Sequence, residues 1–513
     1  MTSFYMIRYR IETNKIENLL KIILKCDIKI MIIFRNERII KMKIELIGGC
    51  TKDELERRIQ NVAAAGKLSR FPGNVSEVLE SCNDYESNLK LIKRIIKMGH
   101  KSIIEHDYLL FALNDVTPIV EQTIIGYRLT SFTIKSRREV DFRTVGFYTP
   151  EFRNKDGEIH EKNEELKEEY NKHMKYLFNT YGEIVDSGVK VEDARFVLPY
   201  SYHSNIIMGL DGRELEKMIV ALRNGHLSNI PDLKELGNKL YEIAKEHVPY
   251  LVSSLKAQED NLKTGFEYLE SLEERPEIKI LEKAKMISYT PDADDVVLES
   301  SIMYHYQCSK EEAKEILAKM VKKDKDAKAK MMNEIMHKDE RRELEQVSFT
   351  FQIPISLSIL THLTRHRMHS LLIPEFTPMW NMNNFVIPES VKANANEIYV
   401  EATKKNIEMV EKFKALGVNE GDLVYFYLGN QMLNVVTTMN ARNTQWVCRL
   451  RCCNKAQWQI RFIAKEIAKQ VSEVAPLIGK GLGATCMTDR YCGEGRECCG
   501  LIDSLLAADE KNK

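Results

Sequence analysis

Two short groups of side chains in this sequence could bind an anion. One is Arg365-His366-Arg367, in which two guanidiniums flank an imidazole. A guanidinium stays charged and donates paired hydrogen bonds, so this group suits a phosphate or an electron-rich heterocycle. The other is Ser136 and Arg138, which point to the same side if the chain is extended there and could hold one phosphate together. Taken alone, the first could equally be a solvated basic turn and the second a polar edge strand.

The elements that position these groups are predicted from the spacing of apolar residues. A helix is predicted after Pro354, ending at Arg365, because apolar residues recur at helical spacing: Ile355, Ile359, Leu360 and Leu363. Residues 103–113 and 346–353 predict strands. Charge-rich segments with helical spacing predict helices with solvated outer faces rather than binding surfaces: residues 158–185, 232–262 and 309–346.

A weak internal repeat indicates a duplication. Residues 104–111 resemble residues 344–351, at an offset of 240. Asp193 precedes Arg213 by 20 positions and Asp422 precedes Arg442 by 20, at an offset of 229. The shared order of these matches predicts two diverged copies of a unit of roughly 220 residues, which is an ordinary domain size.

Composition is that of an ordinary folded protein. The 513 residues are 44% hydrophobic, and 75 basic side chains balance 75 acidic ones. Zero net charge argues against binding of bulk nucleic acid or anionic membrane and favours small ligands. The apolar stretch 19–34 contains Lys21, Lys25, Asp27 and Lys29, so neither a membrane span nor a secretion signal is predicted. Eleven cysteines, mostly single, indicate reduced thiols and a cytoplasmic location.

Four regions are predicted along the chain. Residues 1–41 form an extension that differs in composition, and Met42 is interpreted as the natural start because a strand-like run follows it. The alternative is that residues 1–41 are a genuine additional helix–strand element. The first repeat unit is assigned to residues 42–275, with a linker around 266–280, and the second to residues 276–485.

The fourth region, residues 486–513, is a tail rich in cysteine and glycine. Its thiols could bind zinc, but the C-x-x-C pair of a zinc knuckle is missing, so no metal is predicted: Cys486, Cys492, Cys498 and Cys499. We interpret His106 as a structural histidine in a strand. His362 lies one helical turn before His366 and could approach a ligand held there, but surface packing is the favoured interpretation. Trp458 and the apolar residues that follow it at helical spacing are interpreted as packing residues.

Several motifs resemble the flavin-dependent thymidylate synthase family, whose signature is Arg-His-Arg-x-x-Ser-x-x-x-x-Ser-x-Arg. The second copy matches its front half at Arg365 to Ser370, and the first copy matches its back half at Arg128 to Arg138. Further segments resemble family blocks: Gly99 to His106, Asp193 to Pro199, and Asn440 to Arg461. The resemblance covers most of residues 42–500.

The resemblance implies an α+β fold in which each copy is a small sheet with packed helices. It implies synthesis of dTMP from dUMP with FAD, NADPH and methylenetetrahydrofolate. Carried over residue by residue, it assigns flavin contacts to Arg365, His366, Arg367, Ser370, His100, Ser102, Asn440 and Arg442. It assigns dUMP contacts to Ser136, Arg138, Arg195, Arg451, Ser131 and Arg128, with Arg365 and Arg451 as the catalytic pair.

The departures from the family pattern suggest that the two copies share one site. Glu375 and Thr377 stand in the second copy at the places of the last Ser and Arg of the signature, and Val424 stands at that of Arg195. Gly126 and Tyr127 replace the leading Arg-His in the first. We therefore expect one composite working site and one dead site, in a homodimer that mimics the family tetramer.

One departure favours a different function. The acidic residue of the signature is Ile134 in one copy and Ile373 in the other. The alternative is therefore a non-catalytic paralogue that binds flavin or nucleotide.

Overall fold

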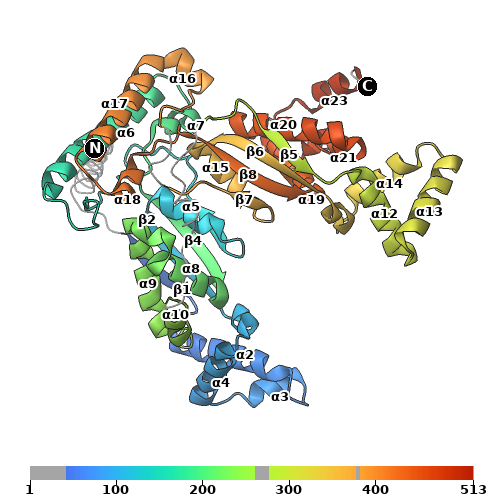
Figure 1. The fold of residues 1–513 in the computed structure, drawn as a ribbon, viewed down its shortest axis with the longest axis horizontal. Coiled ribbons are helices and arrows are strands. Elements are labelled where there is room, and N and C mark those ends of the chain that lie inside the picture. The colour runs from blue at the N-terminus through green and yellow to red at the C-terminus, as the bar shows by residue number, and fades with distance from the viewer. Residues whose placement is uncertain (1–41, 260–276, 377–381, 512–513) are drawn as a thin grey trace, which may run out of the picture.

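Two antiparallel sheets of four strands organise the molecule (Figure 1). The computed structural model describes residues 42–259, 277–376 and 382–511. The first sheet has the order β1 (Lys43–Gly48), β2 (Tyr108–Val116), β4 (Ser204–Asp211), β3 (Ser131–Ile134). The second repeats that order with β5 (Lys285–Tyr289), β6 (Ser348–Ser356), β8 (Met432–Asn440), β7 (Ser370–Leu372). The predicted α+β duplication is confirmed.

Helices are placed between the strands in a similar order in the two copies. Those of the first copy are α2 (Lys52–Leu68), α3 (Val75–Glu80), α4 (Tyr85–Lys97), α5 (Pro118–Gly126), α6 (Asn163–Asp186), α7 (Val191–Ala194), α8 (Gly212–Asn224), α9 (Pro231–His247) and α10 (Val252–Glu259). Those of the second are α12 (Ala293–Tyr306), α13 (Lys310–Lys323), α14 (Ala327–His337), α15 (Leu357–Thr364), α16 (Glu389–Asn394), α17 (Asn396–Ala415), α18 (Glu420–Leu423), α19 (Ala441–Arg451) and α20 (Trp458–Val474), followed by α21 (Pro476–Lys480), α22 (Thr485–Thr488) and α23 (Ile502–Lys511). Short 3-10 helices include η1 (Lys101–His106), η2 (Arg195–Val197), η4 (Arg342–Gln346) and η5 (Val424–Phe426).

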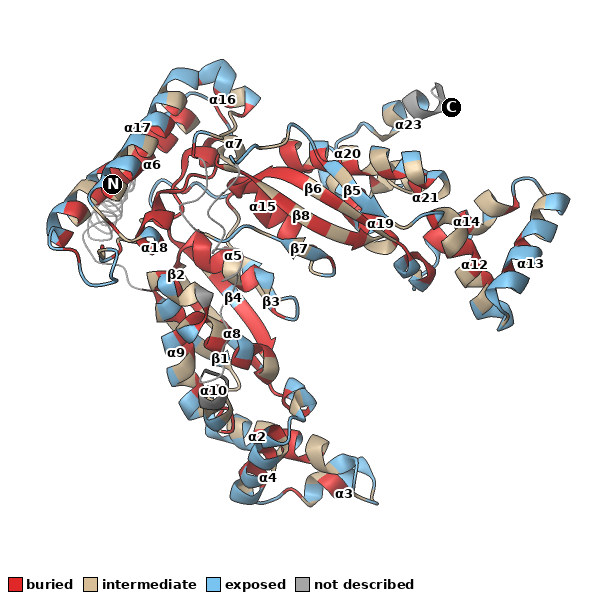
Figure 2. Cartoon of the chain, viewed as in Figure 1, coloured by how far each residue is buried: buried red, intermediate tan, exposed pale blue. Residues whose placement is uncertain are grey.

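Each sheet buries one face under helices. Burial alternates along β8, with every second residue buried, as expected for a strand that is covered on one side. Helices α8 and α9 belong to the first sheet, and α19 and α20 to the second (Figure 2). The small helical groups α2–α4 and α12–α14 lie at the outer ends of two arms, the first at the bottom and the second at the right in Figure 1.

The local structure differs from the expectation in three places. Residues 103–106 form the end of η1 rather than a strand, because Ile103 and Ile104 pack inward while His106 is exposed. The helix predicted after Pro354 begins later, because Pro354 still lies within β6. It follows the last pairing of β6 with β5, at Gln352, and proline is tolerated at such an edge. Residues 136–140 form a turn, in which the Arg138 amide donates to the Ser136 hydroxyl at 3.3 Å.

The interpretation of His106 as a buried structural histidine is therefore wrong. The proposed start at Met42 and most of the predicted linker concern residues outside the described ranges.

The two copies join through matching segments. The Tyr200 amide donates to the Tyr427 carbonyl at 2.7 Å, and the Gly429 amide donates to the Leu198 carbonyl at 3.0 Å. Helices α6 and α17 pack side by side at one corner of the molecule (Figure 1), and α5 contacts α15 near its centre. The junction therefore brings loops of both copies together around α15.

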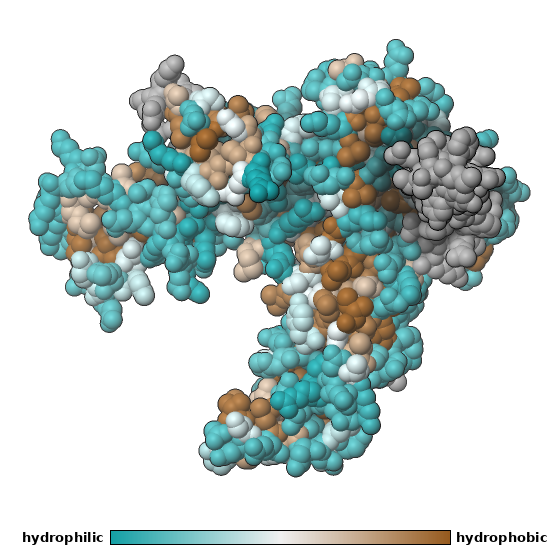
Figure 3. All heavy atoms as spheres, turned by 180° about the vertical axis from the view of Figure 1, so that it is seen from behind, coloured by the Kyte–Doolittle hydropathy of each residue, from teal (hydrophilic) through white to brown (hydrophobic). Residues whose placement is uncertain are grey.

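The surface of the molecule carries both polar and apolar residues. Seen from behind in Figure 3, apolar residues gather among polar ones along the arm that holds the first sheet. Within the described ranges, no helix is both long and apolar enough to cross a bilayer.

Candidate active site

Five arginines from the two copies gather at the junction. Arg137 and Arg138 follow β3, Arg195 begins η2, Arg365 caps the C-terminus of α15, and Arg451 ends α19. Burial lowers the pKa of Arg365 and of Arg451; the charges of Arg137 and Arg138 lower that of Arg365 further, and those of Arg365 and Arg138 lower that of Arg451 further. Arg138 and Arg365, which belong to different copies, are therefore close enough for their charges to interact.

Contacts with backbone and carboxylate groups hold the arginines of the first copy in place. Arg138 Nε forms an ion pair with Glu192 Oε1 at 2.5 Å, and another of its guanidinium nitrogens donates to the Lys455 carbonyl at 3.0 Å. Arg195 Nε donates to the Glu192 carbonyl at 2.9 Å. The short helix α7 thus positions two guanidiniums, and the turn after α19 contacts one of them.

The site carries a surplus of positive charge. Burial, followed by the charge of Arg137, lowers the pKa of Arg195 to about 9. Glu121 pairs with Arg137 at 3.1 Å, and Glu192 pairs with Arg138, so two carboxylates face five guanidiniums. A pocket with that imbalance favours an anion, and phosphate accepts from several arginines at once.

Two histidines of α15 and its end are held neutral. Arg451 Nε donates to His366 Nε2 at 3.0 Å, so this nitrogen carries no proton. Burial and the neighbouring arginines lower the pKa of His366 to about 3 and that of His362 well below its ordinary value. His366 can therefore donate a hydrogen bond only through Nδ1.

His362 lies inside the cluster rather than at the surface, and the surface interpretation is wrong. Its side chain is 2% exposed, and its Nε2 lies 3.4 Å from a guanidinium nitrogen of Arg195. Its Nδ1 has no hydrogen-bond partner among the described residues. A buried polar atom without a partner is a place for a ligand or water to bind.

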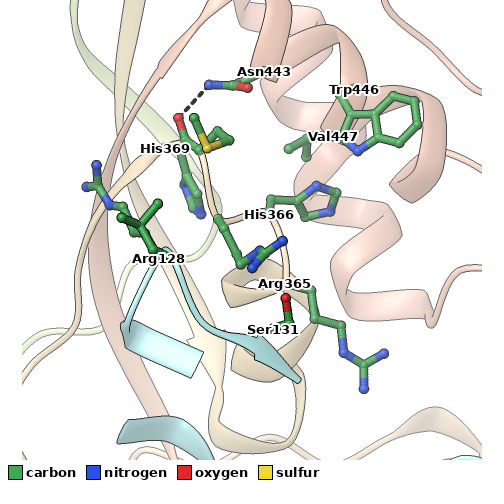
Figure 4. Close-up of a pocket in the computed structure, with 11 residues that line it drawn as sticks. Arg128, Ser131, Arg365, His366, His369, Asn443, Trp446 and Val447 are labelled. Carbon is green, nitrogen blue, oxygen red and sulfur yellow. Dashed lines mark hydrogen bonds between the residues drawn. The ribbon is translucent and has the colours of Figure 1, made fainter. Parts of the chain in front are cut away.

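A cavity of about 440 Å³ opens beside the cluster (Figure 4). This size is within the range of small-molecule sites. Its walls come from both copies: Arg128, Leu129, Ser131, Arg365, His366, Arg367, Met368, His369, Asn443, Trp446 and Val447. Asn443 Nδ2 donates to the Met368 carbonyl at 2.6 Å, which ties α19 to the turn after α15 (Figure 4). Arg367 donates to the Thr130 carbonyl at 2.5 Å, which ties that turn to the first copy.

The predicted arginines other than Arg442 thus border the cluster or the cavity, Ser131 and His366 line the cavity, and Ser136 accepts from the Arg138 amide. Several other predicted residues do not border either. Asn440 caps α19, accepting from the Asn443 amide at 2.8 Å, and Arg442 pairs with Glu345. Ser370 begins β7. His100 and Ser102 lie at η1 of the first copy, and neither lines this cavity.

The place related to this site by the duplication has lost its cations. Val424, fully buried, occupies the position of Arg195, and Gly126 that of Arg365. Arg223, nearest in sequence to the place of Arg451, stacks on the Tyr241 ring at 3.9 Å. It also donates to Asn238, and so faces α9 instead of the junction.

The carboxylate of the signature has no replacement at its own position. Ile134 and Ile373 are half-buried and pack against the core. Five further residues of the site were not predicted from the sequence, although they belong to the arginine cluster, contact it or line the cavity: Glu121, Arg137, Glu192, Asn443 and Trp446. For His362 a signal existed, since it precedes Arg365 by three and His366 by four and so shares their helix face.

The cysteine-rich tail carries free thiols. Cys486, Cys492, Cys498 and Cys499 form no disulfide. Among the residues that the structure describes, no group of three or more histidine, cysteine or acidic side chains is arranged to hold a metal ion.

Comparisons with known proteins find relatives of both copies. The thymidylate synthase complementing protein family model matches residues 53–250 and 285–477. A flavin-dependent thymidylate synthase of Clostridium tetani is 29% identical over 239 residues, covering 42% of this chain and 93% of that protein. One of Thermococcus onnurineus is 30% identical over 182 residues, covering 35% and 69%.

A solved structure, a UMP/dUMP methylase of Streptomyces cacaoi bound with 5-Br dUMP, matches 40% of this chain and 91% of its own. The identity is 20% and the TM-score 0.32, too low to bear on fold or site.

Proposed function

We propose, because this chain belongs to the thymidylate synthase complementing protein family and carries that family's domain twice, that it is a flavin-dependent thymidylate synthase that converts dUMP to dTMP. The observation that carries the proposal is the cluster of five arginines built from both copies. Ser136, Arg138 and Arg195 bind the phosphate of dUMP, and Arg451 orients the nucleotide. Each charge-assisted contact contributes roughly 1.5–3 kcal/mol.

The cavity beside the cluster suits a flavin. Its wall combines arginines with exposed apolar side chains, and a neutral His366 with a free donor lies between them. When bound, FAD reduced by NADPH mediates methylene transfer from methylenetetrahydrofolate and supplies the hydride. Arg365, His366 and Arg367 hold the flavin, and Arg365 stabilises negative charge on it.

The site is composite, because both copies contribute residues to it, and each chain carries one such site. The first copy contributes the phosphate-binding residues and the second contributes the flavin-binding residues. Support comes from the hydrogen bond of Arg367 to Thr130 and that of Arg138 to Lys455, each of which joins the copies at the site. The duplicated place has Val424 and Gly126 instead of arginines. We further propose a cytoplasmic homodimer, in which two chains supply four family domains.

The test is release of tritium from the uracil 5-position of dUMP, with FAD, NADPH and methylenetetrahydrofolate supplied. Arg138→Ala and Arg365→Ala should each abolish release, because each removes one half of the composite site. Arg223→Ala is the matched control and should retain activity, since Arg223 faces α9. Full activity in either of the first two variants would exclude the composite site.

A non-catalytic flavin- or nucleotide-binding protein is the second candidate. The isoleucines at the acidic position of both signatures favour it. Such a protein would be yellow and bind dUMP, and would release no tritium under the same conditions.

A further inference from the structure

Trp446 is an unusual cavity residue. It lies in the second turn of α19, lines the cavity, and is 54% exposed. Tryptophan is buried in most folded proteins, and its large apolar ring gains most from contact with another flat group. Asn443, Trp446 and Val447 are three and four positions apart, so they share one helix face, and the Asn443–Met368 hydrogen bond fixes that face against the cavity.

The remaining walls define what can lie against the indole. Arg128 and Trp446 are on different sides of the cavity in Figure 4, and Arg365 lies at its lower edge. Leu129 and Met368 add exposed apolar surface. Guanidiniums and apolar groups around one aromatic wall suit a flat heteroaromatic ring that carries negative charge or several acceptors.

We propose that Trp446 stacks on the isoalloxazine ring of FAD and positions it, an inference that rests on the proposed function. An indole is an electron-rich donor, so a stacked flavin loses most of its fluorescence. Tryptophan emission also falls when the ring binds. Neither signal requires turnover, so both report the contact itself.

The experiment titrates purified, flavin-free protein with FAD, FMN and ADP, following flavin and tryptophan emission. Trp446→Ala should weaken FAD binding about 10-fold, since an aromatic pair contributes on that order beyond its area. Its bound flavin should be several-fold brighter than in the native protein. Trp446→Phe should retain most of the affinity and still be bright, because phenylalanine stacks without donating an electron. FMN should respond as FAD does, and ADP should leave tryptophan emission unchanged.

Two controls make the result specific. Tyr304→Ala removes an exposed aromatic ring of α12 that does not line the cavity, and should match the native protein. Trp380→Phe tests the tryptophan outside the described residues as an alternative quencher.

The outcomes separate this inference from the function it rests on. Unchanged FAD affinity and flavin emission in Trp446→Ala, with tritium release intact, would overturn the stacking role and leave the synthase proposal standing. Quenching of tryptophan emission by ADP would also overturn the stacking role, because it would indicate that Trp446 contacts adenine instead of the isoalloxazine ring. A native protein that binds no flavin would overturn both proposals.

Discussion

His366 and His369 are neutral inside the fold. Burial is the main cause in each case, and it lowers the pKa of His366 to about 3 and that of His369 to about 4. His369 Nδ1 also lies 2.6 Å from the Thr437 hydroxyl oxygen. Between pH 6.5 and 4 the unfolded chain therefore binds more protons at these positions than the folded chain does.

We predict that the free energy of unfolding falls as pH falls through that window. Each histidine contributes up to about 1.4 kcal/mol per pH unit. Urea unfolding at pH 7 and pH 5 measures the effect. The double variant His366→Gln, His369→Gln removes both titrations and should show a clearly smaller loss. An equal loss in the variant would assign the pH dependence to other groups.

At the scale of elements, the same tie fixes the start of two equivalent helices. The Thr117 hydroxyl, before α5, donates to Asp232 of α9, and the Ser356 hydroxyl, before α15, donates to Gln459 of α20 at 2.6 Å. Thr117 and Ser356 precede their helices as N-caps, so each tie positions one helix against another. Helix α15 ends at Arg365 of the arginine cluster, whereas α5 carries Glu121, which pairs with Arg137 of the same cluster.

Ser356→Ala and Thr117→Ala therefore form a matched pair. Each removes a hydroxyl that donates to a buried acceptor, so each should lower the free energy of unfolding by about 1–3 kcal/mol. Ser356→Ala should weaken dUMP and FAD binding more than Thr117→Ala does, because it loosens the helix that ends at Arg365, whereas α5 contributes only the partner of Arg137. Urea unfolding and equilibrium binding measure the two effects. Equal binding losses in both variants would show that the tie acts through global stability alone.

The sequence predicts the elements better than their junctions. The order of the repeated motifs predicts the duplication, and the family resemblance implies a sheet in each copy; the two sheets have the same strand order. The repeat offset changes from 240 at Phe111 and Phe351 to 239 at Val116 and Ile355, because β2 holds a bulge near Asp115. Such a bulge depends on pairing with β4, a strand that is distant in the sequence, so no local sequence pattern predicts it.

The candidate site was predictable in its arginines but less so in its environment. Ser136, Arg138 and Arg365 stand in recognisable motifs, whereas Glu192 and Lys455 contact Arg138 from segments distant in the sequence. His362 was misassigned because the helix face that carries it packs against the other copy, and a single copy would leave that face outside.

At the scale of the molecule, both sheets leave one face without helices over parts of their length. Apolar side chains remain exposed there: Tyr108, Leu110 and Ile207 on the first sheet, Ile287 and Tyr289 on the second. Scattered apolar exposure is ordinary, but rows on sheet faces are typical of association surfaces. They agree with the proposed homodimer.

The proposed dimer should bind two dUMP molecules, one per chain, whereas four intact domains would bind four. Calorimetric titration gives the number per chain, and light scattering gives the mass of the assembly. Val424→Arg introduces a buried charge into the duplicated place and should not restore a second site, because Arg365 and Arg451 have no counterparts there. A count of two per chain would contradict the loss of the second site.

The ion pair between Arg153 and Asp422 makes the fusion hard to undo. It joins the two copies at 2.7 Å, where the equivalent Asp193 instead accepts from the Trp458 indole at 3.1 Å. The two copies thus contact each other through residues that are not equivalent. If the gene were split and either piece assembled with its own kind, every resulting pocket would lack one side of the machinery.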